Sequence, residues 1–170
     1  MGIARPLESP AHKIGGLYFN GRNAYVEVPD SESLDITDEI TIEAWVKIHS
    51  PQETWDGIIV KYTGGAEGTG YKLEMADENS VRFALRTQDH EYKPVSSGDL
   101  NYGQWYYIVG TFNGSIQKIY VNTVAVSQIS WEGTIAPNSN SLFLGYDGIG
   151  YFLNGTISSV RIYNRALSEE

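Results

Sequence analysis

Apolar and polar residues alternate along many short segments of this chain, which is the pattern of a β-strand with one buried face. The segment 40–48 is the clearest case, since one face would carry Ile40, Ile42, Ala44, Val46 and Ile48. The segment 105–112 is apolar on both faces and predicts a strand that is covered on two sides. Helical periodicity is limited to single turns, expected near residues 33–36 and from Ser168 onward.

The alternating segments predict an all-β protein. They lie at 17–19, 24–28, 40–48, 57–62, 71–75, 80–87, 105–112, 115–121, 124–129, 141–145 and 152–163. Asn-Gly pairs at 20–21, 113–114 and 154–155 favour turns, because both residues adopt positive φ angles readily. The pair at 113–114 gives the strongest hairpin prediction. Eleven short strands joined by turns indicate a sandwich or barrel.

Composition narrows the function classes. The chain has 170 residues, no cysteine and a formal net charge of −9. These values exclude a disulfide-stapled mini-protein, a thiolate zinc site and a cysteine nucleophile, and they argue against a nucleic-acid partner. The apolar runs are too short for membrane insertion. Residues 1–11 contain no signal-peptide core, so either the protein is made inside the cell or the segment is an excised mature domain. We expect an excised module of a larger multidomain protein.

Aromatic residues fall into two groups. Those inside predicted strands are expected in the core: Trp45, Trp105, Tyr106, Tyr107, Tyr120 and Tyr163. Those in or beside polar loops are Trp55, Tyr62, Tyr71, Tyr92, Trp131, Tyr146 and Tyr151. Exposed rings stack on the apolar faces of sugars, and neighbours such as Arg86 can bond the hydroxyls. The second group therefore predicts a binding face, although any single ring could simply cover loop backbone.

Seven acidic residues and no basic residue lie between Glu27 and Glu43. Carboxylate oxygens are ligands that calcium prefers, but the spacing is not that of an EF-hand loop. The alternative is a solvated face, with Asp30, Ser31 and Asp35 capping a short helical turn.

Four ordered motifs resemble the laminin-G-like, concanavalin A-like jelly-roll family. They are residues 17–29, 40–46, 103–114 with 118–122, and 152–168. The resemblance covers residues 14–170, which we expect to form one concanavalin A-like jelly-roll β-sandwich of two antiparallel sheets after an N-terminal extension at 1–13. It implies a non-catalytic, lectin-like module of a secreted or cell-surface protein, with carbohydrate as the commonest ligand.

Relatives in this family often hold a structural calcium ion where the closing strand meets the first loop. Their closing strand commonly reads Ile-Asp-Asp-Val-Arg, whereas this chain has serine at 158 and 159, and Asn20 stands where an aspartate is common. The residues left for such a site are Asn20, Asn23 and Ser158. Losing carboxylates weakens calcium binding.

Enzymes on this fold are the less favoured alternative. Related glucanases carry Glu-x-Asp-x-x-Glu on one strand. The acidic residues at 74, 77 and 78 of this chain have a different spacing, and residues 77–80 are better explained as a hairpin turn. The trio Arg86, His90 and Tyr92 is the remaining hint of a hydrolase or lyase.

We therefore expect a binding module for polysaccharide or glycan on the concave face or its rim loops. The expected ligand-binding residues are Trp55, Tyr62, Tyr71, Arg86, His90, Tyr92, Trp131 and Tyr146. A protein-interaction or structural adhesion module is the first alternative.

Overall fold

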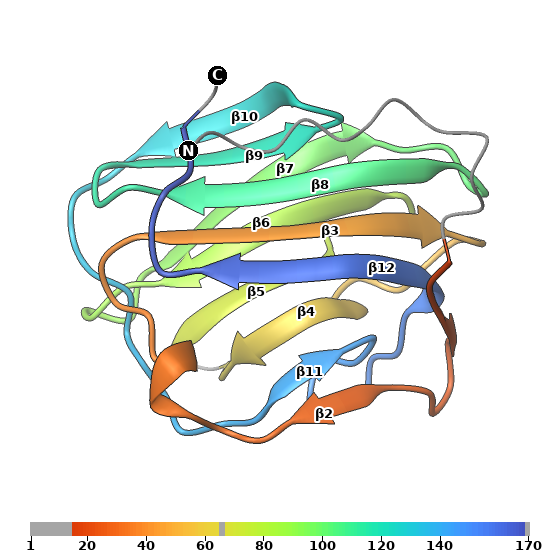
Figure 1. The fold of residues 1–170 in the computed structure, drawn as a ribbon, viewed down its shortest axis with the longest axis horizontal. Helices are drawn as coiled ribbons and strands as arrows, with labels where there is room; N and C mark the ends of the chain where they lie inside the picture. The colour runs from red at the N-terminus through yellow and green to blue at the C-terminus, as the bar shows by residue number, and fades with distance from the viewer. Residues whose placement is uncertain (1–14, 65–66, 169–170) are drawn as a thin grey trace.

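The computed structural model describes residues 15–64 and 67–168 as two antiparallel sheets packed face to face (Figure 1). The first sheet has the order β1 (Leu17–Asn20), β12 (Asn154–Tyr163), β3 (Ile40–Ile48), β8 (Trp105–Phe112), β9 (Ile116–Val121), β10 (Val124–Ser130). The second has the order β2 (Val26–Val28), β11 (Leu142–Leu144), β4 (Gly57–Tyr62), β5 (Gly70–Met75), β6 (Ser80–Arg86), β7 (Tyr92–Asp99). The predicted sandwich is confirmed, while the expected extension at 1–13 lies outside the described residues.

The alternation in the sequence determines which face of each strand enters the core. All five apolar residues of β3 that share one face are buried between the sheets: Ile40, Ile42, Ala44, Val46 and Ile48. Strand β8, predicted to be covered on two sides, sends Ile108 and Phe112 into this core. Its other face buries Tyr107 and Val109 against Tyr120 and Trp45 of neighbouring strands. The outer covering thus comes from side chains of the same sheet.

The aromatic residues predicted for the core divide between the two faces of the first sheet. Trp45 and Tyr107 lie together on the outer face, with ring centroids 5.5 Å apart. The Tyr107 hydroxyl donates to the buried Glu43 carboxylate, which also accepts from Arg161 at 2.8 Å. Tyr107 and Tyr120 are buried as expected. The others are only partly buried, because large rings also cover the polar groups of an outer sheet face: Trp45, Trp105, Tyr106 and Tyr163.

Turn predictions were confirmed where a side chain closes the turn. Asn113 Oδ1 accepts from the N–H groups of Ser115 and Ile116, and Gly114 has a φ of +87°. Asp77 Oδ1 closes the 77–80 turn by accepting from the N–H groups of Asn79 and Ser80. The turn predicted at 154–155 was wrong, because these residues begin β12 and pair with β1 and β3.

One buried polar side chain joins the two sheets. Gln117 of β9 is fully buried, and its amide nitrogen donates to the carbonyls of Phe83 at 3.1 Å and Lys93 at 2.9 Å. Its amide oxygen accepts from Trp131 Nε1 at 2.9 Å. Trp131 in turn stacks on Phe112, with ring centroids 4.0 Å apart.

Candidate functional site

A pocket of about 820 Å³ lies on the outer face of the second sheet, over β4, β5 and β6. Alternation along β5 explains its floor, because Tyr71, Leu73 and Met75 enter the core whereas Lys72 and Glu74 face outward. Its walls come from segments beside the sheet and include Trp55, Asn140, Asp147 and Tyr151.

The centre of the floor is a buried carboxylate that is bonded on both oxygens. Glu74 is 1% exposed, and it accepts from Lys72 Nζ at 2.7 Å and Arg82 Nε at 2.6 Å. The Tyr92 hydroxyl donates to the same carboxylate at 3.3 Å. Burial, followed by the negative charge of Glu74, raises the pKa of Tyr92, while burial lowers the pKa of Lys72. The floor is therefore a rigid charged network.

Aromatic rings surround the cations of this network. Lys72 Nζ lies 3.9 Å from the ring centroid of Tyr62 and 4.9 Å from that of Trp55. The Arg82 guanidinium lies 4.0 Å from the Trp55 ring centroid. Such stacking holds each ring in place. Trp55 stays 40% exposed and has a φ of +87°, an unfavourable backbone angle of the kind that concentrates at binding sites.

Arg86 fixes the other end of the floor. Its Nε donates to the Tyr62 hydroxyl at 2.7 Å, and its Nη1 donates to the His90 carbonyl at 2.7 Å. Burial raises the pKa of Tyr62. Nδ1 of the His90 ring lies 3.1 Å from the Gly68 carbonyl oxygen.

The far wall is an ordered loop after β11. Asp147 Oδ1 accepts from the N–H groups of Ile149, Gly150 and Tyr151, each at 2.9 Å. One carboxylate oxygen thus fixes the backbone of this wall, and Ile149 remains 82% exposed at its tip.

The predicted ligand residues are partly brought together. Trp55, Tyr62, Arg86 and Tyr92 line the pocket, and His90 contributes only its carbonyl, to Arg86. Three others lie elsewhere: Tyr71, Trp131 and Tyr146. Tyr71 is 1% exposed and donates to the Leu34 carbonyl, and Trp131 is packed on Phe112, so neither ring is available to a ligand. Tyr146 stacks on Phe152 at 4.4 Å beside the pocket.

Sequence reasoning missed the charged floor. Lys72 and Glu74 alternate with the core residues of β5, and Glu74 pairs in register with Arg82 of β6. A cross-strand pair of opposite charges, at positions that alternate with the core residues, was the available signal. The contributions of Asn140 and Asp147 had no comparable signal, because they depend on how distant loops fold over the sheet.

The expected calcium ligands do not form an oxygen cage. Asn20 Oδ1 accepts three backbone N–H groups, from residues 22–24, and Asn23 Oδ1 accepts from Asn20 Nδ2. Ser158 donates to the Gly15 carbonyl and lies four residues along β12 from Asn154, the partner of Asn20, a separation of roughly 13 Å. These neutral, already bonded oxygens do not fit a calcium ion.

Within the described part of the chain, no three or more His, Cys, Asp and Glu side chains are grouped so that they could hold a metal ion. The same residues include no helix with the length and apolar character needed to cross a bilayer.

The fold is shared with domains of known sugar complexes, at identities that show the fold alone. A botulinum neurotoxin DC binding domain, solved with SialylT, has a TM-score of 0.68 and 16% identity, covering 88% of this chain and 39% of that one. Domain 4 of the extracellular arabinanase AbnA from Geobacillus stearothermophilus, solved with arabinotriose, has a TM-score of 0.67 and 20% identity, covering 92% and 74%. Trypanosoma rangeli sialidase has a TM-score of 0.67 and 17% identity, covering 90% and 26%.

Sequence comparison finds a relative much longer than this chain. Mouse (Mus musculus) pappalysin-1 is 24% identical over 183 residues, which cover 98% of this chain and 11% of pappalysin-1. The Laminin_G_3 family, described as the concanavalin A-like lectin/glucanases superfamily, matches residues 20–170. The chain therefore belongs to the Laminin_G_3 family of concanavalin A-like domains.

Proposed function

We propose that this domain is a non-catalytic carbohydrate-binding module of a larger extracellular protein, and that the pocket over β4, β5 and β6 is its glycan site. The observation that carries the proposal is an exposed Trp55 ring held beside fixed polar groups in a pocket of about 820 Å³. An indole face stacks on the apolar face of a sugar ring, and Arg86 and Asn140 supply hydrogen bonds at the pocket lining.

Preorganisation of the floor supports a binding role. The rings of Trp55 and Tyr62 are stacked on the cations Lys72 and Arg82 before any ligand arrives. Side chains that are already fixed lose little conformational entropy on binding, which favours affinity. Domains of similar fold were solved with SialylT and with arabinotriose, which supports a sugar ligand. These structures do not indicate whether the sugar is acidic or neutral.

The same network supports a non-catalytic role. A general acid or base must exchange a proton with the substrate near the working pH. Both oxygens of Glu74 are held by cations, and the pKa of Tyr92 is raised by burial, away from that of a base. In the trio considered for an enzyme, the His90 ring contacts the Gly68 carbonyl instead of Tyr92 or Arg86.

Two comparisons support the extracellular, multidomain setting of the proposal. The chain spans about 11% of the pappalysin-1 sequence, and AbnA is an extracellular enzyme with a domain of this fold. The module would then attach a parent protein to glycans.

Affinity electrophoresis tests the proposal. The domain is run through gels that contain arabinan, an acidic polysaccharide or a sialylated glycoprotein, each with and without calcium. Retention by at least one polymer is expected, and Trp55→Ala should weaken it by about 10-fold or more, since a central aromatic anchor carries much of the binding energy.

The matched control is Tyr18→Ala. Tyr18 is 60% exposed but lies on β1 of the first sheet, where it stacks on His49. Its replacement should leave retention unchanged. No retention by any polymer would argue against a glycan module. An equal loss of retention in Tyr18→Ala and Trp55→Ala would show that the binding site is not in the pocket.

A further inference from the structure

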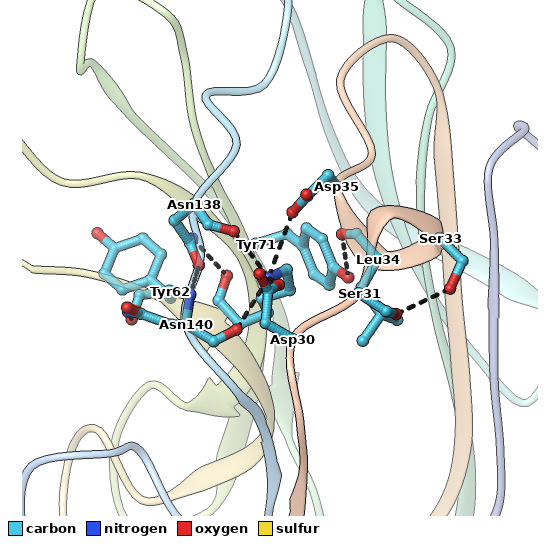
Figure 2. Close-up of polar contacts among 10 residues, drawn as sticks. Asp30, Ser31, Ser33, Leu34, Asp35, Tyr62, Tyr71, Asn138 and Asn140 are labelled. Atoms are coloured by element: carbon cyan, nitrogen blue, oxygen red, sulfur yellow. Dashed lines mark hydrogen bonds and ion pairs between the residues drawn. The ribbon is translucent and has the colours of Figure 1, made fainter.

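Lys61 of β4 is a fully buried cation in a cage of oxygen atoms. Its side chain is 2% exposed, and Nζ lies 2.5 Å from Asp30 Oδ1 and 3.4 Å from Asp35 Oδ1. It also donates to the carbonyl oxygens of Asn138 at 2.8 Å and Asn140 at 2.9 Å. Figure 2 shows these four residues converging on one point from separate segments.

Two carboxylates and two backbone carbonyls form the kind of ligand set that a hard cation such as calcium takes. One of these oxygens is incompletely satisfied. Asp35 Oδ1 is buried and accepts no hydrogen bond, and the ammonium 3.4 Å away supplies charge without a bond. The negative charge of the cage therefore suits a cation. The hydrogen bonds that an ammonium donates are directed, and none of them reaches Asp35 Oδ1.

The cage joins three segments that are distant in the sequence. Asp30 and Asp35 flank the short helix η1 (Glu32–Leu34) after β2, and Asn138 and Asn140 precede β11. Residues 139–141 form a wall of the pocket. The amide of Asn140 also donates to the Tyr62 carbonyl at 3.4 Å, next to Lys61 in β4. The cation is thus bonded directly to the segment that forms this pocket wall.

We propose that the Lys61 ammonium is a built-in structural cation, which takes the place of a metal ion and positions the 138–141 wall of the pocket. The acidic run of residues 27–43 then neither binds calcium nor remains fully solvated, since Asp30 and Asp35 hold a lysine. Wild-type protein should keep this wall without any metal. The role of Lys61 in positioning the wall does not depend on whether the pocket binds a glycan. Only an effect of Lys61 on glycan retention would rest on the proposed function.

The test is to remove the ammonium and offer an ion instead. Lys61→Ser leaves two carboxylates without a counter-charge and space beside them, so its Tm should fall by roughly 10 °C. Millimolar calcium should bind the vacated cage and restore much of the loss. Backbone amide signals of Ser139, Asn140 and Ser141 in NMR spectra should shift in the variant and return with calcium.

Two controls make the result specific. Wild-type Tm and the same amide signals should not respond to calcium or to EDTA. In Lys61→Ser with Asp30→Asn and Asp35→Asn, the carboxylates are gone, so calcium should have no effect. A general salt effect would act on all three proteins alike.

Several outcomes overturn the proposal. Lys61→Ser could keep the wild-type Tm and spectrum, which would show that no cation is needed. It could lose stability without any recovery in calcium, which would show that the cage is not a cation site. If the variant does not fold alone, refolding with calcium decides: recovery supports the proposal, and failure in both conditions rejects it. Glycan retention is not used, so loss of the proposed function would leave this result intact.

Discussion

Asp56, beside Trp55, is a carboxyl group in surroundings that disfavour its charge. It is 6% exposed, and its Oδ2 accepts one bond, from the Glu53 N–H at 2.8 Å. Burial, with smaller contributions from the charges of Glu53 and Asp147, raises its pKa from 3.8 to about 6. The folded state therefore holds a proton that the unfolded chain releases at lower pH.

This pKa predicts a pH-dependent loss of stability. The contribution of Asp56 is fully present below pH 3.8 and is lost as the pH rises through about 6. Each pKa unit corresponds to about 1.4 kcal/mol, so the loss is at most about 3 kcal/mol. Asp56→Asn keeps an oxygen acceptor for the Glu53 N–H and removes the titration.

Urea unfolding at a series of pH values checks this prediction. The free energy of unfolding of Asp56→Asn, minus that of the wild type, should rise between pH 4 and 7. A difference that stays flat or falls over this range would show that Asp56 does not titrate as argued.

Single residues could be predicted from the sequence where local alternation decides their environment. Trp55, Tyr62, Arg86 and Tyr92 were predicted as ligand-binding residues from their positions in or beside polar loops, a signal that could not distinguish them from Trp131. Burial of Trp131 depends on stacking with Phe112 and a bond to Gln117, which are contacts between distant segments. The partners of Lys61 are 26 and more residues away, so alternation in β4 alone gave no sign of the cage.

At Gly110, strand β8 lies so close to the opposite sheet that no side chain would fit between them. A Cβ atom added to Gly110 would lie 2.4 Å from Cγ of Phe83 in β6. The glycine is therefore required by packing between strands, since its backbone lies against an aromatic ring.

Gly110→Ala should destabilise the protein by about 1–3 kcal/mol, because an overpacked core must move rings or backbone. The control is Gly15→Ala, where a Cβ would meet nothing within 4 Å. Denaturant midpoints of both variants measure the difference. Equal, small effects would show that Phe83 moves aside without cost.

Most strands were predictable from the sequence, and the exception has a physical reason. Strand β7 lies at the edge of the second sheet and contains Pro94 and Gly98, which lower the β signal. An edge strand tolerates proline because one side of it makes no ladder bonds. The order in which the strands pair could not be predicted from the sequence either, because β1 and β12 are adjacent only after the whole chain has folded.

The two sheets share one core, so the domain should unfold as a unit. A single cluster contains Ile42 and Ile108 from the first sheet with Leu73 and Phe83 from the second. Neither sheet can keep its inner face buried without the other.

In variants whose only tryptophan is Trp45 or Trp55, the tryptophan fluorescence reports on the first or the second sheet, respectively. Their fluorescence transitions in urea should coincide with each other and with far-UV circular dichroism. Two separated transitions would show that one sheet survives alone.

An apolar interface resists separation of two sheets, but burial is non-directional and gives no preferred position along the strands. Gln117 supplies that position, since its amide nitrogen reaches the carbonyls of Phe83 and Lys93 across the interface. Sliding one sheet by a single residue would leave these groups unbonded in a dry interior, at a cost of about 1–3 kcal/mol for each. The domain is therefore protected against shear as well as against separation, which suits a module that would carry load between a parent protein and an anchored polymer.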